Sequence, residues 1–174
     1  IHSNVWGLAQ NVSLGGRRYF VSFIDNYRWH TWIYLIVKKS EVFDYFRNIK
    51  HLMERETKKR IKCLRLDGKK GILFRPVQLL SSANGNSMRV QLQKYAGVED
   101  VAEEEPVDYG SSKGNAISKF YWAEAVRMAV YIQNRISTTK EKILAHELYF
   151  GQKPNLKHMR VFDSIAYMHV LDEK

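Results

Sequence analysis

The sequence is poor in cysteine, with Cys63 the only one among its 174 residues. A single thiol excludes an internal disulfide framework and a cysteine-rich zinc site. The six histidines do not compensate, because no two of them are spaced as zinc ligands usually are. The near-absence of cysteine therefore predicts an intracellular, reducing environment.

Long apolar runs are also missing. No segment approaches the roughly 18 to 20 residues that a membrane-spanning helix needs, and no charged leader precedes a short apolar run at the start. We therefore expect no membrane partner. The chain begins at Ile1 rather than Met, which favours a piece of a longer polypeptide.

What the sequence has in excess is positive charge. It carries 28 Lys and Arg against 18 Asp and Glu, a formal net charge of +10, with 45% apolar residues. That length and apolar content predict one domain over residues 1–174. The basic balance points to a polyanionic partner such as nucleic acid, although charge alone is a weak signal.

The first 67 residues predict three strands, a helix and a strand. Two β-rich runs flank the polar residues 25–28, which is typical of a hairpin. The second run, residues 31–37, is apolar on both faces, so we expect a central strand covered on two sides. Residues 61–66 predict a further strand that ends at Asp67.

The helix between these strands is predicted over residues 41–57. Its apolar side chains recur at helical spacing and form one stripe. The stripe consists of Val42, Phe46, Ile49 and Met53. Ser40 is the expected N-terminal cap, and the basic residues 58–60 suit the negative end of the helix dipole.

Periodicity then weakens. Residues 68–117 mix Gly, Ser, Asn and clustered acids, so we expect a degenerate or poorly ordered segment within the domain. Helical patterning returns over residues 119–135. We further expect a turn at residues 151–155 and a strand at 164–170. The whole predicts an α/β fold.

Asp67 allows two interpretations. A carboxylate at the end of a strand usually makes a turn hydrogen bond. It is also where an α/β sheet presents ligands, so Asp67 could be one arm of a metal site. The residues around it do not decide between the two.

Five blocks of the sequence resemble the integrase catalytic core of copia-type long-terminal-repeat retrotransposons. In chain order they read "HSNVWG", "LGGRRYFVSFIDNYRWHTWIYLIVKKSEVFDYF", "KKRIKCLRLD", "FYWAEAVRMAVYIQNR" and "GQKPNLKHMRVFDSIAYMHV". The resemblance implies a piece of a Pol polyprotein with a ribonuclease-H-like fold, a mixed sheet flanked by helices. It also implies action in the nucleus, on DNA, as a homo-oligomer.

The chemistry implied by the resemblance is metal-dependent cleavage and joining of DNA. Three carboxylates would hold two Mg²⁺ or Mn²⁺ ions for in-line attack of a hydroxyl on a phosphodiester. The three positions correspond here to Asn4, Asp67 and Glu103. Residues 68–102, thirty-five in all, separate the last two, which is the gap that such integrases favour.

Two departures from the family pattern predict impaired catalysis. Asn4 is neutral, so two carboxylates would face two dications. The residues that the family has after the second carboxylate are replaced here by "GKKGIL", and those that it has before the third are replaced by "KYAGVED". Lys69 and Lys70, in the first of these runs, could contact DNA phosphate, although such a charge run is more often only solvated.

The altered text suggests a history of frameshifts. Residues 71–74 and 104–117 have permissible encodings that give family-like residues when read in a shifted frame. Our hypothesis is that small insertions and deletions put roughly residues 70–100 and 104–117 out of frame. In the span after Glu103, Pro106, Gly110 and Gly114 would break a helix, since an interior Pro costs about 3 kcal/mol and each Gly about 1 kcal/mol. For Glu103 a plain solvated acid remains an alternative.

Two other functional classes remain open. One is a non-catalytic basic remnant that binds nucleic acid through charge, and the other is a pseudogene product without a stable fold. The aromatic residues Trp29, Trp32, Tyr34 and Phe43 are interpreted as core rather than as a base-stacking platform. No role is assigned to His2 or His30.

Overall fold

The computed structural model describes residues 1–67, 88–93, 119–136 and 143–160. They form five strands and three α-helices, with two short 3₁₀ turns. The strands are β1 (His2–Trp6), β2 (Tyr19–Ile24), β3 (Thr31–Ile36), β4 (Cys63–Asp67) and β5 (Arg89–Gln93). The helices are α1 (Val42–Thr57), α4 (Trp122–Gln133) and α5 (Ala145–Phe150), and the 3₁₀ turns are η1 (Lys39–Glu41) and η2 (Lys119–Tyr121).

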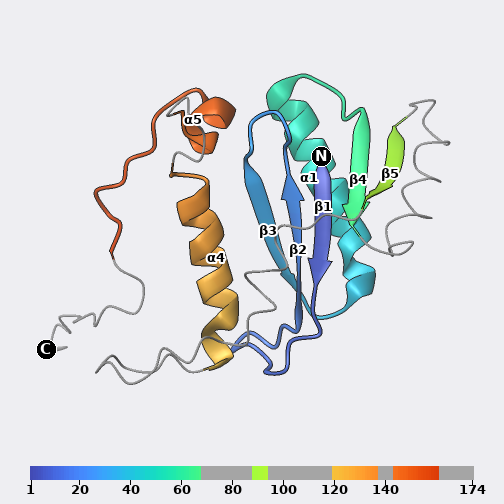
Figure 1. Ribbon diagram of the computed structural model, residues 1–174, viewed down its shortest axis with the longest axis vertical. Coiled ribbons are helices and arrows are strands. Elements are labelled where there is room, and N and C mark those ends of the chain that lie inside the picture. The colour runs from blue at the N-terminus through green and yellow to red at the C-terminus, as the bar shows by residue number, and fades with distance from the viewer. Residues whose placement is uncertain (68–87, 94–118, 137–142, 161–174) are drawn as a thin grey trace, which may run out of the picture.

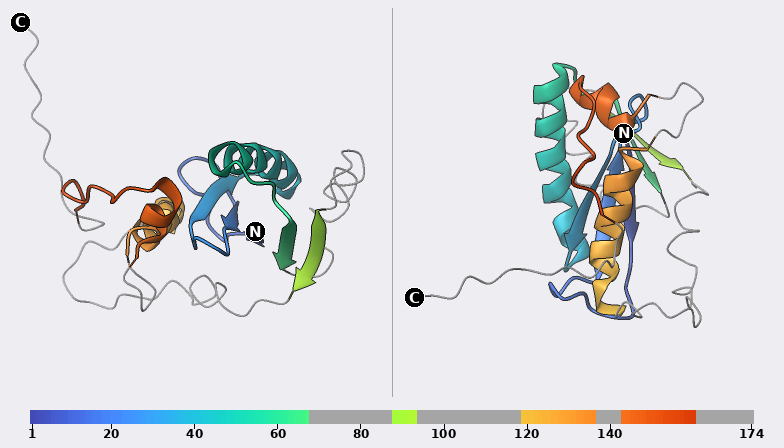
Figure 2. Two further views of the ribbon diagram at one scale, coloured as in Figure 1. Left: turned by 90° about the horizontal axis from the view of Figure 1, so that it is seen from above. Right: turned by 90° about the vertical axis from the view of Figure 1, so that its left-hand side faces the viewer.

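The strands form one mixed sheet in the order β3-β2-β1-β4-β5 (Figure 1). β1, β2 and β3 are antiparallel neighbours, whereas β4 runs parallel to β1 and β5 runs parallel to β4. The two helices α1 and α4 lie on either side of this sheet (Figure 2). This strand order and these directions are those of a ribonuclease-H-like sheet, so the expected fold class is confirmed.

Helix α1 matches the prediction closely. Its buried residues are the predicted stripe, Val42, Phe46, Ile49 and Met53. The expected cap was wrong, however, because Ser40 lies inside the turn η1. The side chain of Glu41 instead accepts a hydrogen bond from the Lys38 backbone N–H at 2.7 Å. At the other end the helix stops at Lys58, whose φ of 54° is left-handed.

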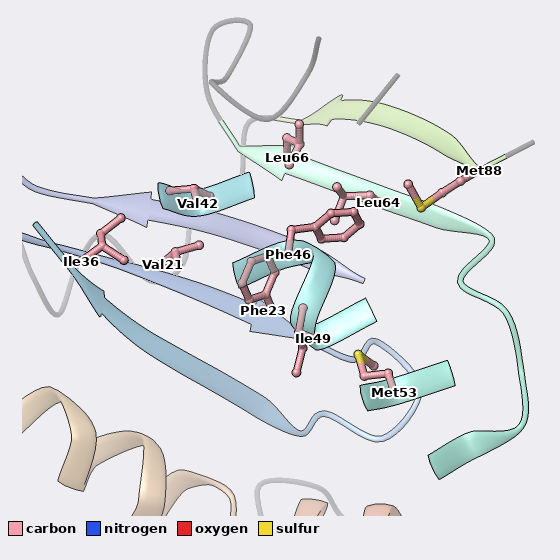
Figure 3. Close-up of a cluster of buried hydrophobic side chains, with 10 residues drawn as sticks. All are labelled: Val21, Phe23, Ile36, Val42, Phe46, Ile49, Met53, Leu64, Leu66 and Met88. Atoms are coloured by element: carbon pink, nitrogen blue, oxygen red, sulfur yellow. The ribbon is translucent and has the colours of Figure 1, made fainter. Parts of the chain in front are cut away.

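The main core lies between α1 and one face of the sheet. Its fully buried side chains come from the helix and from strands β2, β3 and β4, and they interdigitate in Figure 3. Because strand side chains alternate between faces, Val21 and Phe23 on β2 and Leu64 and Leu66 on β4 all point toward α1. This alternation leaves Asn4, Ser22 and Arg65 for the opposite face.

The opposite face is covered near β3 by α4. Ala123 is buried there with Phe20 and Leu35, and Val126 packs beside them. The end of α4 is tied to β3 by Asn134. Its side-chain oxygen accepts from the Thr31 backbone N–H and its side-chain nitrogen donates to the Thr31 carbonyl, both at 2.8 Å.

Strand β3 corrects one expectation. It is an edge strand of the sheet and not a central one, although helices cover both of its faces, which explains its apolar pattern. The hairpin before it forms as predicted, with Asp25 accepting from the Tyr27 backbone N–H. Trp29 was wrongly placed in the core, because it sits at a left-handed φ of 59° in the hairpin and is 51% exposed. Trp32, Tyr34 and Phe43 do pack against the core.

Within residues 68–117 the structure describes one short segment, residues 88–93, which contains β5. This strand was not predicted, although its five residues, RVQLQ, alternate between polar and apolar. Helix α5 was also missed. The predicted strand at 164–170 and the span with Pro106, Gly110 and Gly114 lie outside the described residues. None of the described helices has the length and apolarity to cross a membrane.

Candidate functional site

The first two predicted site positions lie side by side in the sheet. Ser3 on β1 is level with Leu66 on the parallel strand β4. One step further along each strand come Asn4 and Asp67, so these positions are neighbours across the sheet. Asp67 is the last residue of β4, and its backbone is level with that of Gln93 on β5.

Asn4 is half-buried on the sheet face opposite α1. Its cross-strand neighbour on β2 is Ser22. The Ser22 hydroxyl is buried, and no hydrogen-bond partner reaches it within the described residues. Two residues along β1, Trp6 stacks on Phe20 with ring centroids 5.2 Å apart. Position 4 is thus bordered by the apolar rings of Trp6 and Phe20 and by the Ser22 hydroxyl, which can donate a hydrogen bond.

A polar row crosses the sheet beside this position. Arg65 on β4 donates from Nε to the Gln91 side-chain oxygen at 3.1 Å, and its Nη1 lies 3.2 Å from His2 Nε2. Burial, and then the Arg65 charge, lower the pKa of His2, so its ring stays neutral beside the guanidinium near pH 7. The sequence analysis gave His2 no role, because only the register brings it to Arg65.

The metal site itself stays a prediction. Glu103, Lys69 and Lys70 lie outside the described residues, so the structure does not place them relative to Asp67. Among the residues that it does describe, no three His, Cys, Asp or Glu side chains converge as a metal site would require. A hard divalent cation prefers carboxylate and amide oxygens, and the side chains of Asp67 and Asn4 carry such atoms.

A basic hollow lies at the other end of β4. It is formed by the α1–β4 connection and by the first residues of β4 and β5. Its cationic lining consists of Lys59, Arg60, Lys62, Arg65 and Arg89. Among the described residues no acidic side chain contributes to the lining, and Lys59, Lys62 and Arg89 are exposed to solvent.

A third polar cluster joins the β2–β3 hairpin to α5. His30 is 7% exposed, and its ring lies 4.4 Å from Trp32 and 4.9 Å from Tyr149, centroid to centroid. Burial, followed by the nearby His146 and Arg135, lowers the pKa of His30 to about 4. His30 is therefore a neutral core residue that couples α5 to the sheet.

This cluster predicts acid lability. The unfolded chain binds a proton at His30 more readily than the folded chain between about pH 6.5 and 4, so folding stability falls as pH decreases through that window. The shift corresponds to about 3 kcal/mol. Replacing His30 with Phe should flatten the pH dependence of urea unfolding by that order.

The matched control is His51→Gln, at an exposed position on α1, which should leave the pH profile unchanged. An unaltered profile in the His30→Phe protein would show that His30 is protonated equally easily in both states.

No protein-family model matches the chain. The chain is 28% identical over 180 residues to the retrovirus-related Pol polyprotein from transposon TNT 1-94 of Nicotiana tabacum, a match that covers the whole chain. The chain is thus similar to transposon Pol polyproteins over its whole length. The corresponding proteins from transposons RE2 and RE1 of Arabidopsis thaliana are 28% and 29% identical over 96% and 100% of the chain.

The similarity to Pol polyproteins covers only a small part of the length of each relative. The matches span only 14%, 12% and 13% of the length of the TNT 1-94, RE2 and RE1 polyproteins. Among solved structures, the chain matches a simian T-cell lymphotropic virus intasome in complex with PP2A regulatory subunit B56 gamma. That match has a TM-score of 0.49 and 10% identity, and covers 96% of this chain and 61% of the other.

Proposed function

We propose that the chain is an integrase-type catalytic core that cuts DNA and joins DNA strands with the help of divalent metal ions. The observation that carries the proposal is the match of the whole chain to transposon Pol polyproteins. It is supported by the sheet, which makes positions 4 and 67 neighbours. This function requires two partners, DNA and a second copy of the chain. It also requires access to the nucleus.

Each proposed site residue has one role. Asp67, at the end of β4, and Glu103 supply carboxylate oxygens to Mg²⁺ or Mn²⁺. Bound there, the cations would activate the attacking hydroxyl and stabilise the leaving oxygen. Asn4 offers a neutral oxygen where the resembled family has an acid. Two carboxylates offset less of the cation charge than three, so we propose that this copy is catalytically impaired.

The test is a strand-transfer assay with labelled oligonucleotide duplexes in Mg²⁺ and in Mn²⁺. Asp67→Asn should lower the rate by about 100-fold or more, because metal-site charge supplies several kcal/mol of transition-state stabilisation. Asp44→Asn is the control, since it makes the same chemical change at a side chain that is 74% exposed on α1. Equal activity of Asp67→Asn and wild type would overturn the assignment of Asp67.

The basic hollow favours a second candidate function, a nucleic-acid-binding remnant without catalysis. That reading predicts duplex binding by both wild type and Asp67→Asn, with no strand transfer in either metal. Circular dichroism of the wild-type chain separates both functions from the reading in which the chain has no stable fold.

A further inference from the structure

We infer that the basic hollow between the α1–β4 connection and β5 binds the phosphate backbone of double-stranded DNA. It extends from Arg65, in the middle of β4, toward the start of the strand, and so away from the predicted carboxylate site at Asp67. The hollow would be a binding surface in addition to the proposed catalytic site. That the bound duplex is DNA rests on the proposed function.

The first support is the uncompensated charge. Lys59, Lys62 and Arg89 form no ion pair with any carboxylate of the described residues. Glu54, near the end of α1, accepts from Lys50 at 2.8 Å and from the backbone N–H of Ile61 at 3.0 Å. Its charge also acts on Arg60 of the hollow, so the uncompensated cations are Lys59, Lys62 and Arg89. Like charges held close together repel one another, so the hollow is a site at which a polyanion is strongly attracted.

The second support is the floor of the hollow. Arg65 and Gln91 are level with each other on paired strands, and a 3.1 Å hydrogen bond joins their side chains. The Arg65 guanidinium has neutral partners in this bond and in His2, so its charge is not cancelled by them. The exposed Lys62 and Arg89 stand near this floor and can reach phosphate oxygens, as long basic side chains commonly do.

The third support is the spacing along β4. From Cys63, at the edge of the hollow, to Asp67 the strand advances four residues, or about 13 Å. A DNA strand places successive phosphates about 3.4 Å apart along the helix axis. The hollow therefore extends from about two base steps from the predicted reacting phosphate, at Arg65, to about four, at Cys63, and one straight duplex arm is long enough to touch both.

The experiment measures how binding of a random-sequence DNA duplex of about 25 base pairs depends on salt. Each neutralised phosphate contact should reduce the slope of log affinity against log salt by about 0.9. The double variant Lys62→Gln with Arg89→Gln should thus lose about 1.8 from the slope. Between 50 and 200 mM salt, its affinity deficit relative to wild type should then shrink by roughly tenfold.

The matched control is Lys153→Gln with Lys157→Gln. Both lysines are exposed, and the segment 151–160 that carries them follows α5 on the side of the molecule away from β5 (Figure 1). This control removes the same net charge and should leave the slope within error of wild type. Equal slope losses in the two double variants would overturn the inference, because net charge alone would then explain binding. Tighter binding of an RNA duplex, with the same variant effect, would overturn the assignment to DNA.

This result is independent of the catalytic proposal. If wild type transfers strands but the hollow variant keeps the full slope, the hollow does not bind DNA and the proposed function stands. If the slope falls as expected and no metal supports strand transfer, the hollow stands and the proposed function fails. Circular dichroism of each variant confirms that the substitutions, which replace exposed side chains, leave the fold intact.

Discussion

Replacing Asn4 with aspartate is expected to raise metal-dependent strand transfer by about 100-fold or more. The change would place a carboxylate next to Asp67, since the two positions are neighbours on parallel strands. A third negative charge would bind and position the proposed cations more strongly. Metal-ion stabilisation of transition-state charge contributes several kcal/mol, and each 1.4 kcal/mol or so is tenfold in rate.

The surroundings of position 4 suit a carboxylate. The Ser22 hydroxyl, buried on the neighbouring strand without a partner among the described residues, is positioned to donate to it. Asp and Asn have nearly the same shape, so the substitution introduces little steric change. Without metal, however, the new charge repels Asp67, and the variant should gain more stability from added Mg²⁺ than wild type does.

Two measurements check this prediction. Strand transfer is compared among wild type, Asn4→Asp and Asn4→Gln, the last being a neutral control that should not gain activity. The unfolding temperature with and without Mg²⁺ gives a readout that does not depend on catalysis. A lack of gain in both measurements would show that position 4 is not part of a metal site.

Replacing Phe46 with alanine is expected to remove much of the folding stability. The ring is fully buried between α1 and the sheet and lies 6.1 Å from the Phe23 ring, centroid to centroid. Truncating such a residue costs about 3–5 kcal/mol, because the surroundings close the cavity only in part. Whole domains hold only about 5–15 kcal/mol. Urea unfolding should show this loss, with a decrease in unfolding temperature of roughly 6–20 °C.

The control lies one residue away on the same helix. The Arg47 side chain is 54% exposed and makes only a 3.9 Å ion pair with Asp44. Arg47→Ala should change the free energy of unfolding by less than about 0.5 kcal/mol. Similar losses in the two variants would mean that the α1 face toward the sheet is not the core of the folded chain.

The elements predicted well from sequence are those with a strong local signal. The stripe through Phe46 repeats every three to four residues over a helix of sixteen, so period alone identified α1. Helix 119–135 was confirmed as η2 and α4, with Ala123 at its buried face. Strand β5 was missed although RVQLQ alternates as β4 does, because the residues around it show no clear period, and α5, at six residues, is too short for a helical period.

The candidate site was predictable only in part. Asp67 at the end of a strand was identified from the alternating run before it and from the family resemblance, and its role stays a prediction. The row of His2, Arg65 and Gln91 was not identified, because these residues are far apart in the chain. The hollow carried a signal in the basic residues from Lys59 to Arg65, but Arg89 joins them only through strand pairing.

Composition and neighbours within a few residues are enough to define the charge, the α1 stripe, the hairpin and the resemblance to integrase cores. Contacts between distant segments make β3 an edge strand, bring positions 4 and 67 together across the sheet, and gather five cations in one hollow. Strand order and register are set by burial of side chains from such segments against α1, and no local pattern encodes that pairing.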